Sequence, residues 1–407
     1  MTTSARKLRM GMVGGGPGAM IGPLHRIAAA MDGQIELVCG AFSSDSARGR
    51  QAGEALFLPA SRVYDDYRTM MRAEAALPAS ERMDFVAIVT PNDLHFPVAE
   101  AALDYGFHVL SDKPATHSLD EAERLRDRLR ETGLLYGLTH TYTGYPMIKQ
   151  AKALIGEGRL GPVRKVLVEY PQGWLADAAI GEHNKQAAWR LDPARAGASS
   201  CVGDIGVHAA HLAEYVCGDT ITAICADLGA VAPGRDMDDD ATVLLRFARG
   251  ARGVLIASQI CAGEENTLKI RVYGERGGLE WSHADPNSLW LKWPDRPAEC
   301  YRAGGPGLLP LAQANCRTPA GHPEGYLEAF ANHYRNFAGQ IRARLEHRPC
   351  SEVELDVPGI DDALRGMRFI EACVAASRAA DKWQILPEID GIAGTRNSQK
   401  PQEKDTQ

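Results

Sequence analysis

The sequence is short of three features that mark whole classes of protein: long apolar runs, blocks of one charge and paired cysteine motifs. No run is long and apolar enough to cross a bilayer, so we expect no membrane association. Lys and Arg number 45 against 52 Asp and Glu, for a net charge of -7, and neither sign forms a long block. Because phosphate binding needs a clustered basic face, nucleic acid is not an expected partner.

The first residues and the cysteines favour the cytoplasm. The basic start, MTTSARKLRMGMVGGG, runs directly into a strand and a glycine turn, without the apolar core and cleavage site of a signal peptide. The nine cysteines are scattered, and none forms a CxxC pair or a Cys/His cluster with zinc spacing. We therefore expect a cytoplasmic protein with reduced thiols and no metal site.

What is present is a chain long enough for two domains, with 407 residues of which 45% are hydrophobic. We place a dinucleotide-binding domain at 1–145, a second domain at 146–388 and a polar tail at 389–407. In the first domain apolar runs alternate with helical patterns, which indicates βαβ units and a parallel sheet. The expected strands are 8–15, 35–42, 84–90, 107–112 and 134–140, and the expected helices are 22–33, 46–56, 94–106 and 119–133.

The second domain follows a different rhythm, in which strands succeed one another with short turns. The expected strands are 163–170, 220–231, 241–248, 252–262, 268–274 and 278–283, and the expected helices lie near 204–217, 324–346 and 358–381. Such a succession is typical of an antiparallel sheet with one open face. The predicted fold class is α/β, with a parallel sheet in the first domain and a large, open, mainly antiparallel sheet in the second.

A glycine-rich turn joins the first strand to the first helix in MGMVGGGPGAMIGPLHRIAAA. Glycine lets the backbone approach a pyrophosphate closely, and the helix that follows offers free N–H groups. The spacing leaves two alternatives: Ala19 takes the third glycine position, or the loop is three residues longer and Gly22 packs the helix against the strand. We favour the longer loop. The cofactor contacts predicted here are Gly14, Gly16, Gly18, Ala19, Met20 and Ile21.

The end of the second strand bears on the choice between NAD and NADP. An acid in this position holds the ribose 2′-hydroxyl of NAD, whereas basic and hydroxyl side chains suit a 2′-phosphate. Ser43 and Ser44 follow the strand, with Asp45 next and Arg48 one turn later. The cofactor is therefore predicted as NAD or NADP, with both left open.

Two further strands of the same sheet end in polar residues, in TPNDLH and SDKP. Ligands of open parallel sheets bind beyond the carboxyl ends of the strands, so these residues should gather around the nicotinamide. They are Thr90, Pro91, Asn92, His95, Asp112, Lys113 and Pro114. Lys113 is thus expected at the reacting centre.

Asp204 and His208 stand four residues apart at the start of an expected helix, in GDIGVH. From one helix face they can bind the same small ligand or each other. A carboxylate that orients an imidazole suits removal of a proton from an alcohol. Taken singly, Asp204 could equally be a helix N-cap and His208 a packed helix histidine.

Together these motifs resemble the Gfo/Idh/MocA superfamily of NAD(P)-dependent dehydrogenases, over roughly residues 8–380. The resemblance rests on the glycine turn, TPNDLH, DKP for the usual Glu-Lys-Pro, WRLDPARAGASS and GDIGVHAAHL. It implies that Lys113, Asp204 and His208 are catalytic, and that a Rossmann domain precedes an α/β domain whose sheet forms a homodimer or homotetramer. Asp112 in place of Glu departs from the pattern. So do Gly197-Ala198-Ser199-Ser200 in place of a common triple glycine and His211 where the family often has Asp, and these two changes put the substrate in doubt.

The resemblance also implies a substrate with a secondary alcohol, in a sugar, glycoside or cyclitol. Polyols need many donors and acceptors beside flat aromatic faces, and three stretches supply them. The predicted substrate contacts are His140, Tyr142, Tyr145, His183, Lys185, Trp189, Arg190, His322 and Tyr326. Two alternatives stay open: an NAD-dependent redox glycosidase that returns the hydride after elimination, and an inactive nucleotide-binding regulator.

Overall fold

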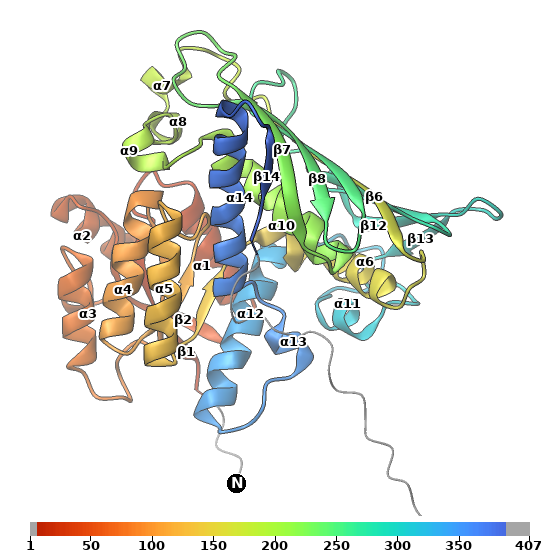
Figure 1. Cartoon of the computed structure of the whole chain (residues 1–407). Coiled ribbons are helices and arrows are strands. Elements are labelled where there is room, and N and C mark those ends of the chain that lie inside the picture. Colours follow the sequence, from red (N-terminus) through yellow and green to blue (C-terminus); the bar gives the residue numbers. More distant parts are fainter. Residues whose placement is uncertain (1–5, 388–407) are drawn as a thin grey trace, which may run out of the picture.

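The computed structural model describes residues 6–387, apart from the side chains of Glu182 and Lys185 (Figure 1). The polar tail predicted at 389–407 lies outside this part of the chain. Within the described residues, no helix has both the length and the apolar character needed to cross a membrane.

Five parallel strands form the first sheet, in the order β2-β1-β3-β4-β5. They are β1 (Leu8–Gly14), β2 (Ile35–Ala41), β3 (Phe85–Val89), β4 (His108–Ser111) and β5 (Tyr136–Leu138). The parallel sheet predicted from the alternating pattern is confirmed. The strand order reverses between β1 and β3, and a reversal of this kind opens a crevice at the carboxyl ends of the strands.

Helices cover both faces of this sheet (Figure 1). One face carries α3 (Tyr67–Ala75), α4 (His95–Asp104) and α5 (Leu119–Thr132). The other carries α1 (Ile21–Met31) and, from far along the chain, α12 (Tyr326–Leu345), which buries Phe330, Tyr334 and Phe337 against the sheet. A helix that follows the second sheet in sequence therefore completes the core of the first.

Nine strands form the second sheet, in the order β13-β12-β11-β10-β6-β9-β8-β7-β14. Neighbours are antiparallel except for β6 and β9, so the mainly antiparallel prediction is confirmed. The strands are β6 (Val163–Pro171), β7 (Ile221–Gly229), β8 (Asp240–Phe247), β9 (Arg252–Ser258), β10 (Lys269–Gly274), β11 (Gly278–Ser282), β12 (Asp285–Lys292), β13 (Glu299–Arg302) and β14 (Trp383–Ile385). The last three were not predicted, because β12 opens on turn residues and the others are very short.

Only one face of this sheet is covered by helices (Figure 1). The covering helices are α6 (Pro146–Gly156), α10 (Val207–Cys217) and α14 (Ile360–Arg378). Along β8 buried and exposed residues alternate strictly, as expected for a strand with one solvent face. The remaining helices are α2 (Ser46–Ala55), α7 (Ile180–His183), α8 (Lys185–Arg190), α9 (Pro193–Ala196), α11 (Pro310–Ala314) and α13 (Glu352–Leu355).

Candidate active site

The carboxyl ends of the parallel strands open on a cleft of about 1240 Å³, which is lined by residues from the parts of the chain that form the first and the second sheet. This volume exceeds that of a usual pocket for one small molecule and suits a dinucleotide together with a substrate. We call its two parts the nucleotide end, around the turns after β1 and β2, and the reaction end, around Lys113 and Asp204.

The glycine turn at the nucleotide end has no room for side chains. A Cβ on Gly22 would lie 2.4 Å from the Cα of Gly15, and one on Gly16 would lie 2.5 Å from the Phe42 oxygen. Helix α1 starts at Ile21 and no side chain caps it, which leaves its first N–H groups for an anion. The structure therefore has the longer loop, with Gly22 against the strand end, and the turn fits a pyrophosphate.

Most of the cofactor contacts predicted in this turn line the cleft. Gly14, Gly16, Ala19, Met20 and Ile21 do so, together with Gly15 and Pro17, which the prediction left out. Gly18 does not line the cleft. Its φ of 77° lies in the left-handed region, which glycine adopts without strain.

At the end of β2, the predicted Ser43, Ser44 and Arg48 all line the cleft. Asp45 instead caps helix α2, because its Oδ1 accepts the backbone N–H groups of Ala47 and Arg48 at 2.9 and 3.2 Å. The acid that could have reached a ribose hydroxyl is thus committed to the helix. Sequence reasoning missed the neighbouring Asp65, Asp66 and Tyr67, which also line this end.

The ends of β3 and β4 supply Thr90, Pro91, Asn92, Asp112 and Lys113 to the cleft, as predicted. His95 and Pro114 were predicted there and are not. The His95 ring is buried, 2.6 Å from the Pro114 oxygen and 3.0 Å from the Thr90 oxygen. Its role is to tie the two strand ends together behind the cleft surface.

Asp204 contacts three other polar side chains at the reaction end. Lys113 Nζ donates to Asp204 Oδ1 at 2.8 Å and to the Asp204 backbone oxygen at 2.5 Å. The other carboxylate oxygen accepts Gln259 Nε2 at 2.9 Å and lies 3.2 Å from Arg190 Nε. Burial alone would raise the pKa of Asp204, but the cations of Arg190 and Lys113 outweigh it and hold the pKa well below its usual value. The carboxylate stays charged.

Asp204 does not cap a helix, since it lies inside a π-helical turn, Val202–Gly206, that precedes α10. The expected hydrogen bond from Asp204 to His208 is also a wrong prediction. Two cations take the carboxylate, and a charge-assisted pair is stronger than a bond to a neutral ring. His208 Nδ1 instead lies 3.2 Å from His140 Nδ1.

His208 lines the cleft and is neutral at pH 7. Burial lowers its pKa well below the usual value, and the Lys113 ammonium lowers it further. A neutral imidazole beside an ammonium can accept a proton from a group that the ammonium binds. All three residues predicted as catalytic, Lys113, Asp204 and His208, therefore lie at one end of the cleft.

Four of the predicted substrate contacts line the cleft: Tyr142, Trp189, Arg190 and Tyr326. Four others do not, for different reasons. His140 is buried behind His208, and Tyr145 is buried with its hydroxyl 2.9 Å from His283 Nε2. His183 and His322 are exposed and do not line the cleft, although Asn184, the residue after His183, does. The side chain of Lys185 lies outside the described residues.

A polar network on the cleft wall was predicted only in part, through Tyr142. Asn266 Nδ2 donates to the Tyr142 hydroxyl at 3.0 Å, and its Oδ1 accepts Tyr170 Oη and Gln172 Nε2, both at 2.6 Å. These residues line the cleft with Trp174 and His283. Tyr170 and Gln172 gave a signal, as polar side chains at the end of a predicted strand, whereas nothing local marks Asn266.

Two family models match the chain: "Oxidoreductase family, NAD-binding Rossmann fold" over residues 8–140, and "GFO/IDH/MocA C-terminal domain" over residues 148–280. The oxidoreductase YfiI of Bacillus subtilis is 33% identical over 387 residues, which are 93% of this chain and 97% of that protein. A levoglucosan dehydrogenase of Pseudarthrobacter phenanthrenivorans is 26% identical over 339 residues, covering 75% of this chain and 80% of that protein.

Among solved structures, an inositol dehydrogenase homolog from Azotobacter vinelandii complexed with NAD+ superposes with a TM-score of 0.89 at 35% identity, over 94% of this chain and 98% of that chain. A structure titled for the same homolog with NADH and myo-inositol superposes with a TM-score of 0.87 at 34% identity, with the same coverage. The glycine turn, the strand-end residues and the second sheet all agree with these matches, and the chain belongs to the Gfo/Idh/MocA family of NAD-binding oxidoreductases.

Proposed function

We propose that this oxidoreductase oxidises a secondary alcohol of a sugar or cyclitol, with NAD or NADP as hydride acceptor. The observation that carries the proposal is the pairing of Lys113 with Asp204 beside a neutral His208 at the reaction end of the cleft. When bound, the nicotinamide supplies the acceptor for the hydride. The chain itself must bind the alcohol oxygen and remove its proton.

Lys113 is the residue that binds the alcohol oxygen. An ammonium has three N–H donors, and two of them go to the Asp204 backbone oxygen and carboxylate. The third remains for the substrate. Asp204 fixes the direction of the ammonium and offsets its charge, so Lys113 stabilises the negative charge that develops on the substrate oxygen.

His208 is the base that takes the hydroxyl proton. Asp204 cannot serve, because Lys113, Gln259 and Arg190 occupy both carboxylate oxygens. Lys113 is held as a donor by the same carboxylate. Two histidines line the cleft in the described part of the chain, His208 and His283. Both ring nitrogens of His283 have partners, Tyr145 Oη at 2.9 Å and the Asn266 backbone oxygen at 2.8 Å, whereas His208 is neutral and lies at the reaction end, which supports assigning the base to His208.

The walls around the reaction end support a polyhydroxylated substrate. The network of Tyr142, Tyr170 and Asn266 offers hydroxyl and amide groups that can each donate and accept. Trp189 and Trp174 offer aromatic faces, with the Arg190 guanidinium 4.2 Å from the Trp189 ring centroid. The relatives named for inositol and levoglucosan act on compounds of this chemical class.

Reduced-nicotinamide absorbance tests the proposal, with NAD or NADP incubated with myo-inositol, levoglucosan, monosaccharides and nitrophenyl glycosides. Accumulation of reduced cofactor with an unmodified sugar or cyclitol is the expected result. Release of nitrophenol at catalytic NAD without net reduction would instead identify a redox glycosidase. Cofactor binding without turnover of any compound would favour a regulator.

We also propose that the open face of the second sheet joins copies of this chain into a dimer or tetramer. Leu244, Ile256, Tyr273 and Trp290 are between 38 and 44% exposed, and strand register places them on this same face. Apolar side chains gathered on a helix-free face support an interface. Light scattering after size exclusion should give a mass of two or four chains, and Trp290→Glu should lower it.

A further inference from the structure

The contact between His208 and His140 has a chemical consequence. Both rings are buried, and burial lowers the pKa of each well below its usual value, so both are neutral. Their Nδ1 atoms lie 3.2 Å apart. A neutral imidazole protonates only one nitrogen, so in this contact one ring donates its Nδ1–H and the other accepts it.

The direction of this hydrogen bond decides whether His208 can act as a base. If His140 donates, His208 carries its proton on Nε2, and the atom that faces the cleft is a donor. If His208 donates, its Nε2 is bare and can accept a proton from an alcohol. Two hydrogen bonds to Asp204 fix the Lys113 ammonium at the same end of the cleft, where it favours a lone pair over an N–H on the cleft side of His208. The Asp204 carboxylate acts on His208 in the opposite sense, but its charge is paired with Lys113 and Arg190.

We propose that His140 is the positioning residue of the reaction: it accepts the Nδ1–H of His208 and thereby keeps Nε2 of His208 unprotonated toward the substrate. A carboxylate usually holds a catalytic histidine in this way. Here the carboxylate of Asp204 belongs to Lys113, and a neutral imidazole takes its place. The inference rests on the proposed function, since a base is needed only where an alcohol is oxidised.

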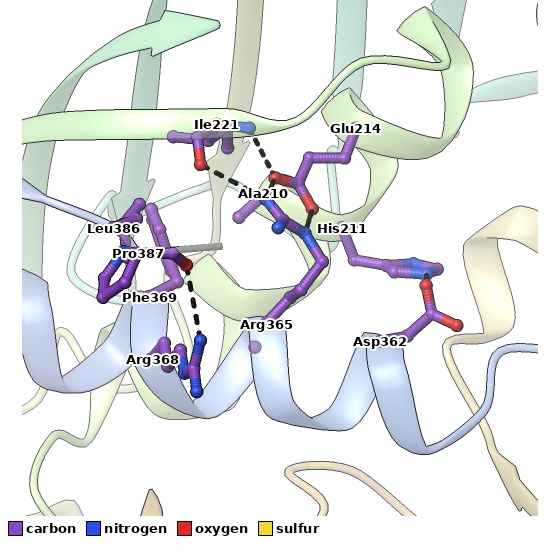
Figure 2. A pocket seen from close by; sticks show the side chains of 11 residues that line it. Ala210, His211, Glu214, Ile221, Asp362, Arg365, Arg368, Phe369, Leu386 and Pro387 are labelled. Atoms are coloured by element: carbon purple, nitrogen blue, oxygen red, sulfur yellow. Dashed lines mark hydrogen bonds and ion pairs between the residues drawn. The ribbon is translucent and has the colours of Figure 1, made fainter. Parts of the chain in front are cut away.

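The surroundings of His140 fix its ring. The His211 ring stacks on it, with centroids 4.1 Å apart and an interplanar angle of 14°. His211 is held in turn by Asp362 of helix α14, at 3.3 Å, on the wall of a second, smaller cavity (Figure 2). His333 Nε2 lies 3.0 Å from the His140 backbone oxygen. The His140 ring is thus held by stacking on His211, and its backbone by His333.

The proposed arrangement has a cost. The proposed tautomer puts an N–H on His140 Nε2, for which the described residues provide no acceptor. Nor do any three His, Cys, Asp or Glu side chains in the described part of the chain form a group that could hold a metal ion.

The test reads the tautomer directly, by NMR of the full chain labelled with ¹⁵N in the histidine rings and free of substrate. The His208 signals are identified by their loss in His208→Asn. We expect the proton on Nδ1 and a bare Nε2 in the unsubstituted chain. A proton on Nε2 of His208 would overturn the proposal, whatever the enzyme turns over, so this result is separate from failure of the proposed function.

Two variants extend the test to turnover. His140→Asn keeps an acceptor near the position of Nδ1 and should retain the tautomer and kcat within about tenfold. His140→Phe keeps the ring stacked on His211 without an acceptor, and kcat should fall about 10²-fold while KM and cofactor affinity change by less than about twofold. In a His208→Asn background, His140→Phe should cause no further loss. A loss that persists there would show a merely structural role and overturn the proposal.

Discussion

The two ends of the cleft differ in whether backbone or side chains form them. The nucleotide end is mostly backbone. A Cβ does not fit on Gly22, which packs on Gly15, or on Gly16, which packs on Phe42, and the start of helix α1 offers N–H groups. The reaction end is mostly side chains, with Asp204 bonded to Lys113, Arg190 and Gln259. The backbone of the glycine turn is thus suited to hold a cofactor, and the charged side chains around Asp204 are suited to act on a substrate.

This difference predicts that substitutions at the two ends fail in different ways. A change at the reaction end should remove turnover and leave cofactor binding intact. A change at the nucleotide end should weaken the cofactor and leave kcat at saturation nearly unchanged. A substitution at either end that changed both kcat and cofactor affinity would contradict this difference between the two ends.

The largest effect is expected from Lys113→Met. The variant removes the donor to the substrate oxygen, so kcat should fall by about 10³ or more. The affinity for the reduced cofactor, followed by its fluorescence, should stay within about threefold. Lys7→Met, an exposed lysine in the first domain, is the matched control and should leave both values unchanged. Loss of cofactor binding in Lys113→Met would show that the lysine holds the nucleotide instead.

The second effect is expected from Gly22→Ala. The added methyl would lie 2.4 Å from the Gly15 Cα, so the helix must move away from the turn. The dissociation constant of the cofactor should rise by about 10²-fold, with kcat at saturating cofactor within about threefold. Gly156→Ala at the end of helix α6 meets nothing within 4 Å and serves as the control. Equal effects of the two substitutions would show that close packing at the turn is unimportant.

Features that depend on neighbours along the chain could be predicted from the sequence. Each strand of the parallel sheet is one apolar run, and its carboxyl end follows from the direction of the chain, so Lys113, Asn92 and Ser43 were placed correctly in the cleft. The same logic failed for His95, which lies at a strand end and yet is buried beneath it. Position in the sheet does not fix the direction of a side chain.

Features that depend on distant residues were not predictable. Asp204 was expected to pair with His208, four residues on, but its partner Lys113 is 91 residues away. The apolar stripe of helix α12 predicts that Phe330 and Phe337 are buried, but not that they pack against the first sheet. Asn266 carries no local signal, because its role exists only where Tyr142 and Tyr170 meet.

The reaction end should also account for part of the pH dependence of stability, through His333. Burial lowers the pKa of this histidine to about 3, whereas in the unfolded chain it titrates near 6.5. Between these values the unfolded state binds more protons, so stability falls as the pH drops, by at most about 1.4 kcal/mol per pH unit. His333→Gln keeps a donor for the His140 oxygen and does not titrate.

Urea unfolding at pH 6 and pH 5 measures this effect. The loss of unfolding free energy between the two should be smaller in His333→Gln than in the unsubstituted chain, by roughly 1 kcal/mol. His322→Gln, on an exposed loop, controls for the removal of a histidine. An unchanged difference in His333→Gln would mean that the ring has the same pKa in the folded and the unfolded chain, so that burial does not lower it.

The smallest effect concerns the choice between NAD and NADP at the nucleotide end. Arg48 is the cationic side chain that lines the cleft there, with Ser43 and Ser44. Arg48→Ala should raise KM for NADP by about tenfold, because a guanidinium pairs with a 2′-phosphate, and KM for NAD by no more than about twofold. Arg50→Ala, on the exposed side of helix α2, is the control. Arg48 Nη2 also donates to the Pro17 oxygen at 2.8 Å. An equal rise in KM for NADP and for NAD would therefore show that Arg48 acts by holding the glycine loop. The side chain would then support the backbone that binds the cofactor and would not recognise the 2′-phosphate.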